Sequence, residues 1–323
     1  MFSQKEIQSI VKEAFSQLDW QREPIGLYAP QGYILSLGGK KIRPTLTLMA
    51  ANLFSESIEE AVNAALGLEI FHNFTLLHDD IMDKAPMRRN QPAVHVKWNE
   101  NTAILSGDAM LIKAYQLMAE VADDKRKACL DIFSQTALEV CEGQQYDMDF
   151  ETRSDVSADE YIEMIRLKTS VLLAACLKIG AVIGGANEEE AQQLYDFGIN
   201  LGLGFQLKDD WLDVYGNAET FGKQIGGDIL ANKKTFLLIT AFSEANSEQK
   251  VELIHHLTTT NHPQEKIACI TELYTQTGAK RLCEEKIRQY FDKALDGLHR
   301  LEIAEEKKRE LLDLTQNLIV RNH

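Results

Sequence analysis

The chain has 323 residues, 45% of them hydrophobic and 26% charged, which is typical of a globular protein with a sizeable core. Its 34 Lys and Arg residues against 49 Asp and Glu residues give a net charge of -15. That balance argues against nucleic acid or an anionic membrane as the main partner.

The five cysteines are odd in number and none form a C-x-x-C pair, so reduced thiols are expected. The longest apolar stretch, 171–186, contains Lys178 and is short for a bilayer span. We therefore expect a cytoplasmic protein without stable membrane insertion.

Helices are the predicted elements along the whole chain. No proline lies between Ala93 and His262, and proline breaks helix interiors, so long helices are permitted there. Apolar residues recur at helical spacing in 62–77, 103–121, 127–148, 161–183, 191–214, 267–295 and 302–320. No segment shows sustained alternation of apolar and polar residues, so no sheet is expected. The pattern predicts an all-α bundle of roughly a dozen helices in a single domain over residues 1–323.

The first candidate site is an acidic cluster that directly follows the apolar stretch 71–77. Asp79 and Asp83 stand four residues apart, so on a helix their carboxylates share one face, about 5–6 Å apart at the β-carbons. Asp80 flanks the same face. Like charges at this spacing destabilise a helix unless something neutralises them. A bound cation is one way to supply that neutralisation.

The second candidate site repeats the Asp-Asp-x-x-Asp spacing with Asp209, Asp210 and Asp213, after the apolar stretch 201–207. A solvated helix face is the ordinary interpretation of one such triplet, but a repeat after a second apolar stretch favours metal binding. Hard carboxylate oxygens suit Mg²⁺, which binds through one or two carboxylates plus substrate phosphates. The two triplets together predict a site for Mg²⁺ ions and a diphosphate.

Basic residues near these triplets would complete such a site. The glycine-rich segment 38–44 places two cations where a helix start also favours anions. Each basic signal is weak alone, since such residues are usually on the surface, but in an acidic chain their grouping is informative. The residues concerned are Lys40, Arg43, Arg88, Arg89, Lys168, Lys223 and Lys233.

Five motifs in this order resemble the trans-isoprenyl diphosphate synthases, also called polyprenyl synthetases. They are GGKKIRP at 38–44, HDDIMD at 78–83 with RR at 88–89, KT at 168–169, FQLKDDWLD at 205–213, and GK…DILANK at 222–233. The resemblance implies one all-α bundle with a deep central cavity, usually as a homodimer. It also implies a reaction in which an allylic diphosphate condenses with isopentenyl diphosphate and pyrophosphate is released. About three Mg²⁺ ions are expected from the family, with Mn²⁺ as an alternative.

The resemblance also implies a role for each matched residue. Asp79, Asp83 and Asp209 match metal ligands, with Asp80, Asp210 and Asp213 beside them. Arg88, Lys168, Lys223 and Lys233 match the residues that bind the allylic diphosphate. Lys40, Arg43, His72 and Arg89 match the isopentenyl diphosphate pocket. Lys168, Thr169 and Gln206 match the catalytic groups, of which Thr169 and Gln206 lie beside the developing carbocation. His78, Asp147 and Asp149 remain without an assigned role.

Product length is expected to depend on residues that precede Asp79 on the same helix. One helical turn is about 5.4 Å. Thr75 and Phe74, about one turn before Asp79, would form the first level of the bottom of a cavity for the prenyl tail, and Phe71, about two turns before Asp79, would form the second level. A phenylalanine at the first level blocks a long tail, whereas the smaller Thr75 leaves the floor half closed. This favours a product of fifteen to twenty carbons, geranylgeranyl diphosphate rather than farnesyl diphosphate. Alternatively, both phenylalanines are ordinary core aromatics.

Other functions are open from the sequence. A longer-chain polyprenyl diphosphate synthase would differ from this expectation only at the residues that form the bottom of the cavity for the prenyl tail. A class I terpene cyclase typically lacks the second aspartate triplet and the Gly-Gly-Lys-x-x-Arg segment, both of which are present here. A non-catalytic partner subunit would be expected to have an eroded aspartate motif. We expect a trans-prenyltransferase.

Overall fold

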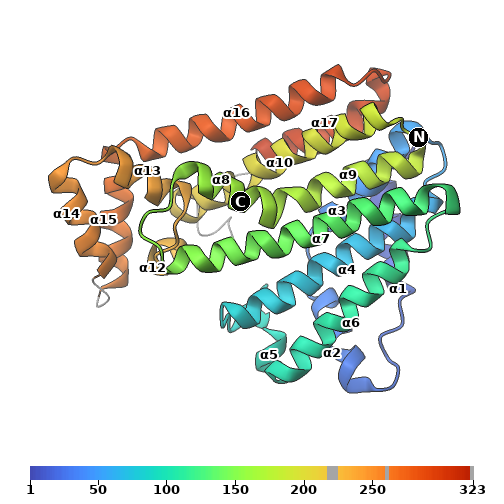
Figure 1. Ribbon diagram of the computed structural model, residues 1–323, viewed down its shortest axis with the longest axis horizontal. Coiled ribbons are helices and arrows are strands. Elements are labelled where there is room, and N and C mark those ends of the chain that lie inside the picture. Colours follow the sequence, from blue (N-terminus) through green and yellow to red (C-terminus); the bar gives the residue numbers. More distant parts are fainter. Residues whose placement is uncertain (217–224, 259–261, 321–323) are drawn as a thin grey trace. The chain divides into compact units, whose positions relative to one another are not determined.

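The computed structural model describes residues 1–216, 225–258 and 262–320, and most of these residues are helical (Figure 1). This confirms the expected all-α class. In chain order the elements are α1 (Gln4–Ser16), α2 (Ile25–Ser36), α3 (Ile42–Phe54), α4 (Glu59–Met82), β1 (Met87–Arg88), β2 (Gln91–Pro92), α5 (Val94–Lys97), α6 (Glu100–Met118), α7 (Asp123–Thr152), α8 (Ala158–Ile165), the π-helix η1 (Arg166–Ser170), α9 (Val171–Gly184), α10 (Glu188–Tyr215), α12 (Gly227–Leu230), α13 (Phe236–Glu244), α14 (Ser247–Thr258), α15 (Pro263–Gln276), α16 (Ala279–Arg300) and α17 (Glu305–Val320).

Several helices begin at a capping signal in the local sequence. Ser157 accepts a hydrogen bond from the backbone of Glu160, whose side chain accepts from the Ser157 backbone at 2.9 Å. Ser3 and Glu6 form the same reciprocal pair at the start of α1. Each pair satisfies two backbone N–H groups that no helical carbonyl can reach. Both pairs therefore stabilise the start of their helix.

Two predicted helices are interrupted. The segment 267–295 forms two helices rather than one, because Gly278 adopts φ 82° and caps the start of α16. The segment 161–183 is helical throughout, but its middle turn, η1, is a π-helix. Turns of this kind often occur at functional sites.

A short β-hairpin is the departure from helix in the described part of the chain. Met87 and Arg88 pair antiparallel with Pro92 and Gln91. The turn residues Arg89 and Asn90 have φ 52° and 61°. Positive φ at both positions is what a two-residue hairpin turn of type I′ requires. The expectation of no sheet is therefore wrong for these four residues, while the all-α class is unaffected.

The chain divides into two compact units. The first comprises Met1–Gln135, Ala175–Leu194 and Glu302–Leu311, and the second comprises Thr136–Ala174, Tyr195–Leu301 and Leu312–His323. In the first unit α4 packs along α6 and against α3 (Figure 1). In the second unit α13 packs against α16 and α15. Each unit carries one aspartate triplet.

One apolar helical stretch, Ala158–Gly184, is long enough to cross a membrane by length and composition. However, 72% of its apolar window is buried inside the protein, as in a core helix. The five cysteines are all free thiols, and three of them are buried: Cys129, Cys176 and Cys283. This agrees with the expected absence of a disulfide framework.

Candidate active site

Each aspartate triplet lies at the C-terminal end of a long helix. α4 ends at Met82 and α10 at Tyr215, and neither helix has a basic residue in its last turn. The C-terminal end of a helix carries the negative end of the macrodipole, which favours cations. Carboxylates there repel both one another and the helix end. The negative charge at the C-terminal ends of α4 and α10 must therefore be neutralised by a cation from outside these helix turns.

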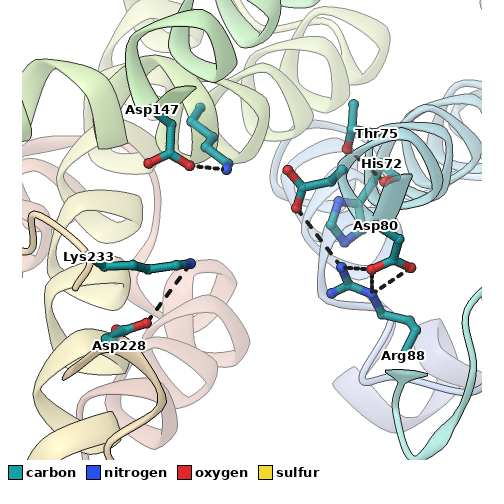
Figure 2. A network of polar contacts seen from close by, with 9 residues as sticks. His72, Thr75, Asp80, Arg88, Asp147, Asp228 and Lys233 are labelled. Atoms are coloured by element: carbon teal, nitrogen blue, oxygen red, sulfur yellow. Dashed lines mark hydrogen bonds and ion pairs between the residues drawn. The ribbon is translucent and has the colours of Figure 1, made fainter. Parts of the chain in front are cut away.

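In the first triplet the middle carboxylate is held by an arginine. Asp80 is 1% exposed, and Arg88 donates to both of its oxygens, from Nε at 3.0 and 3.2 Å and from a terminal nitrogen at 2.5 Å (Figure 2). Burial raises the pKa of Asp80, and the Arg88 hydrogen bonds partly offset that rise. The same terminal nitrogen lies 3.9 Å from Asp79. The β-hairpin thus presents Arg88 to the triplet, and Asp80 fixes its direction.

The glycine-rich segment forms a cationic start to α3. Gly38 and Gly39 have φ 86° and 117°, and Arg89 donates a hydrogen bond to the carbonyl of Gly38. A Cβ on residue 39 would come within 2.8 Å of the Arg89 guanidinium, and the φ of 117° at this position is one that residues other than glycine rarely adopt. Lys40 is exposed beside it. The structure therefore brings together the predicted pocket residues Lys40, Arg43 and Arg89.

Burial and neighbouring cations hold His72 neutral. Burial lowers its pKa well below 6.5, and the nearby Arg43, Arg89, Arg88 and Lys41 lower it further. Burial also lowers the pKa of Arg43, and no described residue accepts a hydrogen bond from its Nε. A buried N–H donor without an acceptor is costly, and an anionic ligand would satisfy it.

Glu69 is the acidic neighbour of these cations and was not predicted. It is 3% exposed, lies 3.2 Å from the ammonium of Lys41, and accepts from Asn73 at 3.2 Å. Its charge opposes the lowering of the Arg43 pKa. The signal in the sequence is a lone acid within the apolar run 64–71, three residues before His72 and so on the same helix face.

The predicted floor residues lie in an aromatic cluster. The rings of Phe71 and Phe74 are 5.6 Å apart, and Phe71 packs edge-on against Phe133 of α7 at 5.3 Å. Tyr115 of α6 packs on Phe133 at 4.8 Å. Thr75 turns its hydroxyl back to the carbonyl of His72 at 2.8 Å (Figure 2). Phe133 and Tyr115 were missed because they come from distant helices.

His78 joins α4 to α6. Its Nε2 lies 3.1 Å from the carbonyl oxygen of Ile104, and its ring contacts Phe74. A Cβ on Gly107 would come within 2.3 Å of the same nitrogen. The imidazole therefore fills the space left by a glycine, which is a packing role.

In the second triplet the middle carboxylate is again bound by protein groups. Asp210 is 5% exposed, and it accepts hydrogen bonds from Tyr161 and from Gln206, the latter at 3.0 Å. Burial raises the pKa of Asp210 to about 8, Asp228 adds to the rise, and the two hydrogen bonds oppose it. Thr169 donates to Gln206 at 3.4 Å. The predicted pair Thr169 and Gln206 thus lies in one network, with Tyr161 as an unpredicted member.

The π-helix η1 carries Lys168 and Thr169. Lys168 forms an ion pair with Asp147 of α7 at 2.6 Å (Figure 2). A Cβ on Gly143 of α7 would lie 2.3 Å from the backbone nitrogen of Lys168, so the glycine lets the two backbones touch. Asp149 accepts a hydrogen bond from Gln145 at 2.8 Å and is exposed. Of the two unassigned acids, Asp147 therefore belongs to the Lys168 cluster.

A short helix connects the second triplet to Lys233. Asp213 accepts a hydrogen bond from the backbone of Asp228 at 2.9 Å, at the start of α12. Lys233, just beyond the end of α12, lies 3.9 Å from the carboxylate of Asp228 (Figure 2). Lys223 lies outside the described residues.

The donor set fits a divalent cation that is shared with phosphate. Among the described residues, no three His, Cys, Asp or Glu side chains form a group that could enclose a metal. Mg²⁺ is ordinarily bound in this way, by one or two carboxylates and by substrate phosphates rather than by a protein cage. Asp79 in the last turn of α4 and Asp83 at its C-cap are oxygen donors of that kind.

Comparison with known proteins agrees with this chemistry. The chain is 44% identical over 238 residues to a geranylgeranyl diphosphate synthase of Methanosarcina mazei, covering 73% of this chain and 74% of the relative. It is 33% identical to a geranylfarnesyl diphosphate synthase of Natronomonas pharaonis, covering 98% and 96%. A crystal structure of a geranylgeranyl pyrophosphate synthase superposes with a TM-score of 0.94 at 46% identity, over all of both chains. Residues 26–274 match the polyprenyl synthetase family, to which this chain belongs.

Proposed function

We propose that this chain condenses an allylic diphosphate with isopentenyl diphosphate to give mainly geranylgeranyl diphosphate. The observation that carries the proposal is the repeated placement of paired carboxylates at the end of an apolar helix, beside arginine or lysine. The family uses a divalent metal and these two diphosphates as substrates. A cation site next to anion-binding side chains is what this reaction needs.

The metal ligands we assign are Asp79, Asp83 and Asp209. The other three carboxylates accept hydrogen bonds from protein groups and orient them: Asp80, Asp210 and Asp213. The metal is Mg²⁺, with about three ions expected by resemblance and Mn²⁺ as the alternative. When bound, Mg²⁺ neutralises the diphosphate and acts as a Lewis acid toward it.

The allylic diphosphate is assigned to four cations: Arg88, Lys168, Lys223 and Lys233. Their charge stabilises the pyrophosphate as its bond to the allylic carbon breaks. Thr169 and Gln206 present a hydroxyl and an amide oxygen, whose lone pairs stabilise the resulting cation. Apolar helix faces exclude water, which would otherwise capture that cation.

Isopentenyl diphosphate is assigned to Lys40, Arg43, His72 and Arg89. The neutral His72 binds as a hydrogen-bond partner rather than as a charge. The double bond of isopentenyl diphosphate attacks the allylic cation and forms the new carbon–carbon bond. The proton then lost from the adjacent carbon passes to the departing pyrophosphate, so no further base is required.

Product length follows from the aromatic cluster of Phe71, Phe74 and Phe133, with Thr75 as the smaller neighbour. These rings are expected to stop the tail at twenty carbons. The geranylfarnesyl relative makes a product of twenty-five carbons the competing outcome, and chromatography of the product distinguishes the two.

We further propose that the chain is cytoplasmic, that its two units work as one domain of residues 1–323 around a central cavity, and that it forms a homodimer without membrane insertion. The support for a dimer is α6, where Leu105 and Ile112 are each 60% exposed and stand two turns apart. Large apolar side chains on one helix face are typical of an interface. Sedimentation of the purified chain tests the dimer.

One assay tests the activity. Purified protein is incubated with Mg²⁺, farnesyl or geranyl diphosphate and labelled isopentenyl diphosphate, and the extended product is separated by chromatography. Chain extension to twenty carbons supports the proposal. A cyclised hydrocarbon would instead indicate a terpene cyclase, and no turnover would indicate a partner subunit.

A further inference from the structure

Helix α15 holds both ends of the four-residue helix α12. At the start of α12, Gly226 has φ 83°, and a Cβ on it would come within 2.7 Å of the side chain of Ile267. Beyond the end of α12, Asn232 is bonded by Lys266, the neighbour of Ile267 on α15. Two consecutive residues of α15 thus contact the two flanks of α12.

Lys266 is a buried lysine with a specific polar environment. It is 5% exposed, and its ammonium donates to Oδ1 of Asn232 at 2.7 Å and to the carbonyl of Leu257 at 3.4 Å. The Nδ2 of Asn232 donates to the same carbonyl at 3.2 Å. Both the oxygen and the nitrogen of the Asn232 side-chain amide are therefore hydrogen-bonded. Lys266, Asn232 and Leu257, which lies near the end of α14, form a closed triangle of hydrogen bonds. Burying an ammonium is costly, so an apolar residue would serve better if only packing mattered.

The triangle of hydrogen bonds holds the side chain of Asn232, the residue that precedes Lys233. Asn232 has φ 53°, a conformation that asparagine tolerates better than most residues. This turn lets the backbone of Lys233 donate to the carbonyl of Asp228 at 2.9 Å and close α12. The backbone direction at Lys233 therefore depends on how Asn232 is held.

We propose that Lys266 is a positioning residue that, through Asn232, fixes the backbone from which Lys233 reaches the allylic diphosphate. The inference rests on the proposed binding of that diphosphate by Lys233. Loss of Lys266 is expected to weaken binding of the allylic substrate more than it slows the chemical step. A lysine with only a structural role would lower stability without selecting one substrate.

The test compares Lys266→Met with Lys233→Met and with Lys250→Met, an exposed lysine of α14 that receives the same change. Steady-state kinetics give KM for farnesyl diphosphate and for isopentenyl diphosphate, and circular dichroism gives Tm. Lys266→Met should raise KM for farnesyl diphosphate about tenfold, or about 1.4 kcal/mol, with less than about a twofold change for isopentenyl diphosphate. Lys266→Arg should restore part of the loss, and Lys250→Met should match the wild type.

The outcomes separate this inference from the proposed function. If Lys233→Met raises KM for farnesyl diphosphate and a folded Lys266→Met does not, the positioning role is refuted and the proposed function stands. If Lys233→Met leaves that KM unchanged, the assignment of Lys233 itself is refuted. Should Lys266→Met not fold, Asn232→Gly replaces it, because glycine accepts φ 53° and deletes only the side-chain bonds. An unchanged KM in Asn232→Gly would then overturn the inference.

Discussion

Gly143→Ala should damage catalysis from a position that touches no substrate. The new Cβ would lie 2.3 Å from the backbone nitrogen of Lys168, and ordinary contact begins at 3.4 Å. The π-helix must therefore move by the difference, 3.4 − 2.3, or about 1 Å, because backbone atoms cannot rotate away as a side chain can. Lys168 and Thr169 move with it.

The size of the effect follows from that displacement. A misplacement of about 1 Å among catalytic groups costs about a hundredfold in rate, so kcat should fall by about that factor. Overpacking of this kind costs about 1–3 kcal/mol of stability, which would lower Tm by a few degrees and leave the variant folded at assay temperature. Steady-state turnover with farnesyl diphosphate and labelled isopentenyl diphosphate measures the first effect, and circular dichroism measures the second.

Gly297→Ala is the matched control. Gly297 lies on α16 and its Cβ would meet nothing within 4 Å, so the same added methyl group should leave kcat unchanged. It should also stabilise the helix by about 0.5–1 kcal/mol. A Gly143→Ala variant that turns over like the wild type, or a Gly297→Ala variant that loses as much activity, would show that crowding of η1 by residue 143 does not affect catalysis.

Four further outcomes are expected. Asp79→Ala should cut turnover by about three orders of magnitude with Tm unchanged, because charge neutralisation in the transition state is lost, and near-normal activity would contradict the metal assignment. Arg43→Ala should mainly raise KM for isopentenyl diphosphate and Lys168→Ala should mainly affect the allylic substrate; swapped effects in the same kinetic assay would reverse the two pockets. Phe74→Ala should lengthen the product by one or more isoprene units on chromatography, whereas an unchanged product would place the floor elsewhere. His72→Gln should reduce the loss of Tm between about pH 7.5 and pH 5.5. The pKa of His72 in the folded protein lies below 6.5, its usual value in an unfolded chain. Below pH 6.5 the unfolded chain therefore binds a proton that the folded protein does not, and the wild type loses stability. An equal loss of Tm in both proteins would count against a neutral buried imidazole.

Much of the fold could be predicted because helices are encoded locally. The apolar stripe at 62–77 predicted α4, and the spacing of Asp79 and Asp83 predicted that they share the end of a helix. Capping pairs such as Ser157 and Glu160 are equally local. The break at Gly278 was missed because one glycine within a helical pattern is tolerated as often as it ends a helix.

The parts that could not be predicted depend on contacts between distant segments. Glu69 is a lone acid in the sequence, and only the fold places it beside Lys41. Phe133 looks like any apolar residue of α7 until α4 is packed against it. Lys266 and Asn232 are separated by 34 residues, and Lys266 belongs to no motif. In each case the missing information is a pairing, which a single sequence does not reveal.

The three carboxylates of each aspartate triplet have different surroundings. Successive residues of a helix point about 100° apart, so three acids at positions one, two and five cannot all face the same way. In both triplets the middle carboxylate, Asp80 or Asp210, is buried and accepts hydrogen bonds inside the protein. A natural replacement there would change how an arginine or a glutamine is oriented while leaving the outer acids in place. If the outer acids are the metal ligands, as proposed, related chains that keep only the outer pair would differ in the orientation of a neighbouring side chain and keep the proposed ligands.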